Sequence, residues 1–216
     1  MLLLNLLVAL ANFWIWKVFK DNWLMGIVLI SISFLLFFLV IKFNKIICIL
    51  ILILSLFLCG QIVTSGFDKN LTTLTVDGQK QLDTRHGYFS LELGKLFQNK
   101  YSLHFYKDFY PYLSSYENNV FNALNPNLYF FENHPREKGS VGEFPKYPGI
   151  FILPFMVGFL FLFKSAPKFV VIYFLSVLFI TGFIRQGYSL GPILFYPLIN
   201  FLITDGSIRI YKIFRK

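Results

Sequence analysis

The chain has 216 residues, of which 56% are hydrophobic, 20% aromatic and only 14% charged. An ordinary soluble domain has roughly 45–50% apolar residues, so this composition indicates a membrane protein. The net charge of +9 does not indicate a nucleic-acid-binding protein, because residues 64–148 hold nine Lys/Arg and nine Asp/Glu. The other basic residues flank hydrophobic segments, which is typical of membrane topology, and we expect no nucleic-acid partner.

Residues 1–63 are predicted to form an N-terminal membrane module of three transmembrane helices. Each of the last two apolar segments has about 18 residues, or about 27 Å of helix, close to the thickness of the hydrocarbon core. The first segment lacks the basic start and small-residue cleavage site of a signal peptide, so we expect the protein to retain it. The three segments are Met1–Phe19, Leu24–Ile41 and Ile46–Val63.

Residues 64–148 differ from their surroundings because polar and aromatic residues are mixed there. Apolar residues at helical spacing, such as Phe109 and Leu113, predict short amphipathic helices and no sheet. The tyrosines are too dense for a freely solvated loop and suit a surface that is apolar on one side and wet on the other. We expect this extracytoplasmic, aromatic-rich insertion to lie on the bilayer.

Residues 149–216 are predicted to form a C-terminal membrane module of three shorter helices and a basic tail. Pro192 and Pro197 favour a kink in the last of them. The predicted fold is thus an all-α membrane protein with about six transmembrane helices and one large, mostly helical insertion. The last three segments are Ile150–Phe163, Phe169–Ile184 and Ser189–Thr204.

Six spans would place both termini on one side of the membrane. If that side is the cytoplasm, its short borders carry eight Lys/Arg and the opposite borders carry three. The positive-inside rule therefore predicts cytoplasmic termini and an extracytoplasmic insertion. The middles of the predicted spans carry no charge, which argues against a proton-coupled pump or an ion channel.

The segment Asn125–Gly149 carries the densest group of reactive side chains. His134 and Glu137 are candidate catalytic residues, as base and acid, and Arg136 is a candidate for binding an anion such as a lipid phosphate. The alternative is a surface loop in which Arg136 and Glu137 pair with each other. The histidines do not have the spacing of a metal site, so we expect neither a metal nor a cofactor.

Two acids earlier in the insertion, Asp77 and Asp83, are further candidates for catalysis. An extracytoplasmic carboxylate near the membrane could act as a general base for sugar transfer to a hydroxyl group. The alternative is a solvated helix face, since Lys80 and Asp83 are three residues apart.

Arg185 and Tyr188 lie in the short connection between the last two predicted spans. An arginine at this depth usually has a partner, such as a lipid phosphate or a carboxylate. Arg185 and Tyr188 are therefore candidates for binding a lipid phosphate. The alternative is that Arg185 extends to the membrane surface without a specific partner.

The order of these motifs resembles the C-terminal part of the GT-C superfamily of membrane glycosyltransferases, the protein-mannosyltransferase-like enzymes. The resemblance covers roughly Asp77–Asp205 and is carried by NPNLYFF, HPRE, LPFMVGFLFLF and the Arg185–Tyr188 turn ahead of Gly191-Pro192. It implies use of a polyprenyl-phosphate-linked sugar, a lipid phosphate at Arg185 and a location in the bacterial inner membrane. These enzymes are much longer and have a paired-acid motif in the first extracytoplasmic loop, where this chain has only Asp21.

The leading hypothesis is a GT-C-related integral membrane protein, truncated or non-catalytic, that handles lipid-linked sugars at the extracytoplasmic face. The rival hypothesis is a non-enzymatic structural or assembly subunit whose aromatic region binds another membrane protein.

Overall fold

The computed structural model of the chain describes residues 2–74, 76, 78–80, 83–84, 87, 99–131, 146–185, 188 and 190–215. Within these ranges every regular element is a helix, and one isolated bridge joins Phe67 and Ile184, so the all-α prediction is confirmed there. Three of the described helices are long and apolar enough to cross a membrane, or up to five if each of two bent pairs is one span. The length and apolar composition of these helices suit an integral membrane protein, but the described ones do not give the six separate spans expected.

The first expected span is a bent pair of helices, α1 (Leu2–Leu10) and α2 (Phe13–Asp21), with 70° between them. The break follows from Asn12, whose side-chain oxygen accepts a hydrogen bond of 2.9 Å from the Ile15 amide and caps the start of α2. Such a side chain competes with the backbone for hydrogen bonds and disfavours a continuous helix.

The next two helices, α3 (Trp23–Ile41) and α4 (Lys45–Gly66), agree with the predicted second and third spans. Asparagine side chains cap both starts, from Asn22 and Asn44, and both helices have a mean hydropathy of 3.0. Half of the apolar window of α3 is buried, against 17% of that of α4. Helix α4 therefore lies on the outside of the bundle, where its side chains can face lipid.

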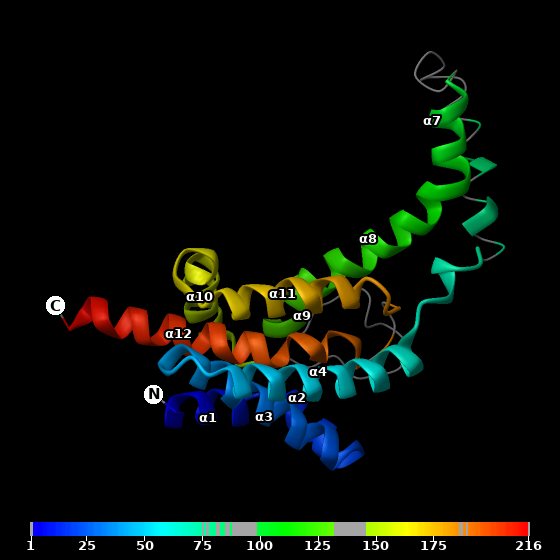
Figure 1. The fold of residues 1–216 in the computed structure, drawn as a ribbon. Helices are drawn as coiled ribbons and strands as arrows, with labels where there is room; N and C mark the ends of the chain where they lie inside the picture. Colours follow the sequence, from blue (N-terminus) through cyan, green and yellow to red (C-terminus); the bar gives the residue numbers. More distant parts are fainter. Residues whose placement is uncertain are drawn as a thin grey trace.

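The fourth and fifth expected spans are α10 (Ile152–Ser165) and α11 (Lys168–Thr181). Each has 14 residues, or about 21 Å of helix, which is short for a hydrocarbon core of about 30 Å. The angle between them is 111°, so together they form at most one broken span or a re-entrant loop. Figure 1 shows this bend, with α10 seen end-on and α11 running across the view.

The last helix, α12 (Tyr196–Phe214), follows the 3₁₀ turn η4 (Gly191–Phe195) and extends ten residues beyond the predicted end at Thr204. Asp205 and Arg209 therefore lie inside the candidate span, which corrects the expectation of charge-free spans. The two side chains form an ion pair at 2.6 Å, and the guanidinium also lies 4.5 Å from the centre of the Phe161 ring. Pairing of this kind lowers the cost of charges within a membrane helix.

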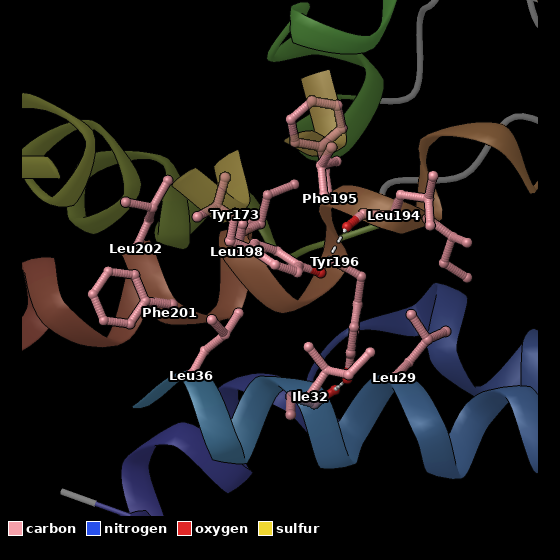
Figure 2. Close-up of a cluster of buried hydrophobic side chains, with 14 of the residues drawn as sticks. Leu29, Ile32, Leu36, Tyr173, Leu194, Phe195, Tyr196, Leu198, Phe201 and Leu202 are labelled. Carbon is pink, nitrogen blue, oxygen red and sulfur yellow. Dashed lines mark hydrogen bonds between the residues drawn. The ribbon is translucent and has the colours of Figure 1, made fainter. Parts of the chain in front are cut away.

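The core of the bundle lies where α3, α11 and α12 meet, as Figure 2 shows. The hydroxyl of Tyr196 also donates a hydrogen bond of 2.8 Å to the Ala9 carbonyl, which links α12 to α1. Six aliphatic and aromatic side chains of α3 and α12 in this core are at most 2% exposed: Leu29, Ile32, Leu36, Leu198, Phe201 and Leu202.

Helices α10 and α12 cross with their backbones in contact. A Cβ atom added to Gly158 would overlap the Leu202 carbonyl, and one added to Gly206 would overlap the Pro154 carbonyl. Small residues allow this approach, which increases dispersion contacts between helices in a membrane.

The described part of the central region is helical, as predicted. Figure 1 shows α7 at a distance from the bundle, and α8 leads back to it. Farther along, Tyr129, Phe130 and Tyr147 are at most 3% exposed and belong to the core of the bundle. The elements are η1 (Lys69–Leu71), α7 (Lys100–His104), the π-helical turn η2 (Phe105–Phe109), α8 (Tyr110–Leu124), α9 (Asn127–Phe130) and η3 (Gly149–Phe151).

Candidate anion-binding site

The Arg185 turn is fixed to the end of α4 by paired backbone hydrogen bonds. The Asp68 amide donates to the Phe183 carbonyl and the Arg185 amide donates to the Gly66 carbonyl, both at 2.9 Å. The ring of Tyr188 lies against Gly66 so closely that a Cβ atom there would overlap it. The first residues after α4 and the residues after α11 therefore form one local structure.

A small, half-open hollow of about 20 Å³ lies beside this turn. Three segments far apart in the sequence line it: α8, the end of α11 with the turn after it, and η4. The lining residues are Asn119, Asn122, Ala123, Thr181, Ile184, Arg185 and Pro192. We call this feature the Arg185 hollow.

A buried carboxylate behind the hollow holds α8 in place. Asp68 is 6% exposed and accepts a hydrogen bond of 2.8 Å from the side-chain amide of Asn119. The same amide donates to the Gly182 carbonyl at 3.1 Å, and the second oxygen of Asp68 accepts from the Asn70 amide at 3.0 Å. These bonds satisfy the Asp68 charge locally, and hydrogen bonds to charged groups are among the stronger ones in proteins.

Tyr116 makes a second connection between α8 and α11, one helical turn before Asn119. Its hydroxyl donates to the Phe179 carbonyl at 2.9 Å, and its ring packs edge-on against Phe183 with 5.2 Å between centroids. A Cβ atom at Gly182 would overlap this ring. Burial raises the pKa of Tyr116 above its ordinary value, so the hydroxyl remains a donor at neutral pH.

Two side chains that line the hollow, Arg185 and Asn122, can donate hydrogen bonds to a ligand. Arg185 is exposed, with its guanidinium 5.9 Å from the centre of the Tyr188 ring. No carboxylate of the described residues forms an ion pair with it. Asn122 also lines the hollow, in a residue 8% exposed, and its side chain forms no hydrogen bond with the described residues. Its amide is not among the fully buried atoms without a partner, so it is open to solvent and can donate to a ligand that brings acceptor oxygens.

The other predicted site residues are not part of this hollow. Asp83 is exposed, and its carboxylate accepts a hydrogen bond of 3.3 Å from Gln79, which agrees with a solvated helix face. Four predicted residues lie outside the described part of the chain: Asp77, His134, Arg136 and Glu137. The structure thus brings together Arg185 and Tyr188 from the predicted set.

No sequence pattern pointed to Asp68, Asn119, Asn122 or Thr181 as part of a site. A partial signal exists, because Asn119 and Asn122 are three residues apart and so share one face of α8. Their relation to Arg185 depends on tertiary packing across 63 or more residues and has no local signal.

Fold and site together define a helical bundle, with apolar helices long enough to cross a membrane and a cationic, polar hollow at one end. Comparison of the chain with protein-family models, with curated proteins and with solved structures gave no match.

Proposed function

We propose that the protein binds the phosphate group of a membrane lipid at the mouth of the Arg185 hollow. The observation that carries this proposal is the exposed Arg185 guanidinium, which has no carboxylate partner among the described residues and lies beside the uncommitted amide of Asn122. A guanidinium can donate two parallel hydrogen bonds to a phosphate, and an amide can donate a third.

The position of the hollow supports a lipid phosphate over a soluble one. It lies at the end of α4, one of the three helices apolar enough to cross a membrane alone. A charged group at the end of a spanning helix is at the depth of lipid headgroups. The mouth can contact a phosphate while the lipid tail stays among the exposed apolar side chains of α4.

The resemblance to GT-C enzymes supplies the class of lipid. We propose that the phosphate belongs to a polyprenyl-phosphate-linked sugar and that the protein handles it at the extracytoplasmic face of a bacterial inner membrane. Arg185 and Tyr188 would then hold the phosphate, with the sugar outside the hollow.

A non-enzymatic structural or assembly subunit is the second candidate, and one observation favours it. None of the described residues that line the hollow is acidic or a histidine, so none of them can act as a general base beside a bound phosphate. If the protein is such a subunit, the bound lipid would hold it in the membrane in the orientation in which it contacts another membrane protein.

Binding of a fluorescent polyprenyl phosphate to the purified protein in nanodiscs tests the proposal. We expect Arg185→Lys to weaken binding about tenfold, because lysine retains the charge but loses the planar pair of donors, and Arg185→Ala to weaken it more. Arg215→Ala is the matched control, since it removes one exposed positive charge at the C-terminal end of the chain.

Two further ligands separate the contribution of the phosphate to the affinity from that of the lipid chain. A polyprenol without phosphate and inorganic phosphate without a lipid should each bind weakly to the unchanged protein. Equal affinities of the Arg185 variants and the unchanged protein for polyprenyl phosphate would contradict the proposal. If Arg215→Ala lowered the affinity as much as Arg185→Ala, the loss would reflect the net positive charge of the protein and not a specific contact between Arg185 and the phosphate.

A further inference from the structure

Three aromatic residues form a stripe along the helical segment that leads into α8. Tyr101, Phe105 and Phe109 follow each other at intervals of four and are 83%, 42% and 65% exposed. Phe105 and Phe109 stack with 6.2 Å between ring centroids and 22° between ring planes. We call residues 100–116 the aromatic arm and these three side chains the aromatic stripe.

The π-helical turn η2 keeps the stripe on one face. Successive α-helical positions four apart turn gradually around the axis, because 3.6 residues make one turn. The wider turn at Phe105–Phe109 reduces this rotation, so Phe109 stays aligned with Tyr101 and Phe105. π-helical turns within α-helices often occur at functional sites.

The direction of the aromatic arm relative to the spanning helices points to its partner. Figure 1 shows α7 beyond the end of α4, running across the direction shared by α4, α11 and α12. A helix on the membrane surface has this orientation when those helices cross the bilayer. The apolar belt of α4, which includes Leu52, Ile53 and Leu56 at 51%, 57% and 70% exposure, lies before that end of the helix and therefore on the bundle side of the arm.

The polar side of the aromatic arm fits the same arrangement. His104 and Asp108 form an exposed pair, one helical turn apart, with 79% and 51% of their side chains accessible. A helix with aromatic residues along one face and charged residues on its flank can place the rings among the headgroups and keep the charges in water.

We infer that the aromatic arm is an anchor on the lipid surface, with the aromatic stripe inserted at headgroup level, and that it sets the depth of the Arg185 hollow. The second part rests on the proposed function. Helix α8 continues from the arm to Asn119 and Asn122, which line the hollow, and Tyr116 fixes the junction to α11. When the arm lies on the membrane surface, it therefore holds α8, which lines one side of the hollow, at the level of the lipid phosphates.

Spin labels at single cysteines test the anchor without any ligand. In nanodiscs of the Cys48→Ala/Cys59→Ala protein, a nitroxide at Phe109→Cys should be more accessible to oxygen than to a water-soluble nickel chelate. The controls are Asp108→Cys, on the polar flank of the aromatic arm, and Leu56→Cys, on the apolar belt. We expect the Phe109 label to lie between them in depth.

A Phe109 label with the same nickel accessibility as the Asp108 label would overturn the anchor, and the aromatic stripe would then suit a protein partner. The coupling to the hollow has its own test in Tyr101→Ser/Phe109→Ser, which changes two of the most exposed aromatic residues. This variant should bind polyprenyl phosphate about fivefold more weakly in nanodiscs and equally well in detergent. Unchanged binding in nanodiscs would refute the coupling, whereas the proposed function is judged separately by Arg185→Ala.

Discussion

Two glycines determine how closely α10 and α12 approach each other. The backbone of each helix occupies the space where the Cβ atom of the facing glycine would lie, at Gly158 and at Gly206. Any larger residue must push the helices apart, because the obstacle is backbone and not the end of a flexible side chain.

Gly206→Ala should therefore destabilise the protein by about 1–3 kcal/mol, the usual cost of overpacking. Gly60→Ala is the matched control, since a Cβ atom at this position in α4 would have no neighbour within 4 Å. That control should be neutral or slightly stabilising, because alanine favours helix more than glycine does. The midpoint of thermal unfolding in detergent measures both, and equal midpoints for the two variants would contradict the crossing.

The candidate site was predictable from sequence only where its residues are neighbours in the chain. Arg185 and Tyr188 are three residues apart, and their position between apolar segments indicated a charged group at the membrane surface. Asp68 and Asn119 are 51 positions apart in sequence and meet only because α8 folds back against the ends of α4 and α11. No local pattern reports such a contact.

At the scale of elements, the short segment at residues 146–148 connects the broken first helix to α12. The Lys146 carbonyl accepts a hydrogen bond of 2.9 Å from the Phe13 amide, at the start of α2. The hydroxyl of Tyr147, 1% exposed, donates to the side-chain oxygen of Asn200 in α12 at 2.7 Å. The other side-chain atom of Asn200, its amide nitrogen, is buried without a hydrogen bond.

Tyr147→Phe should lower the free energy of unfolding by about 1–3 kcal/mol, because the buried Asn200 oxygen then loses its donor. Tyr101→Phe removes the same hydroxyl from a side chain that is 83% exposed and should change stability by less than about 0.5 kcal/mol. Denaturation of both proteins in detergent, followed by tryptophan fluorescence, gives the comparison. A Tyr147 variant as stable as the Tyr101 variant would show that this connection is unimportant.

Helix boundaries were predicted well where hydropathy alone determines them and poorly where capping or pairing intervenes. Uniformly apolar runs gave α3 and α4 nearly to the residue. A hydropathy average is insensitive to Asn12, whose cap divides α1 from α2, and to Pro167, which precedes α11 at the bend from α10. It also ended the last span too early, because the Asp205–Arg209 pair allows α12 to continue.

At the scale of the whole molecule, Figure 1 places the start of α1 and the end of α12 at the same end of the bundle. The Arg185 turn and the aromatic arm belong to the opposite end, where α4 finishes. That both termini lie on one side of the membrane, and that this side is the cytoplasm, stays a prediction from the distribution of Lys and Arg.

Single cysteines in the Cys48→Ala/Cys59→Ala protein test this orientation in intact cells. Asn118→Cys, on α8, should react with an impermeant maleimide added outside, and Phe214→Cys, 86% exposed at the end of α12, should react only after the membrane is opened. The reverse pattern would place the Arg185 hollow on the cytoplasmic side. Reaction of both cysteines from outside would show that the termini and α8 share one side.

The paired backbone bonds between Gly66 and Arg185, and between Asp68 and Phe183, also have a consequence for biosynthesis. About 120 residues separate the two partners, so at roughly 5–20 residues per second the end of α4 waits about 6–24 seconds for its partner to leave the ribosome. During that interval the Gly66 carbonyl and the Asp68 amide must be satisfied by water or by an insertion factor. The hollow therefore completes only after Pro192, the last of its described lining residues, has been made.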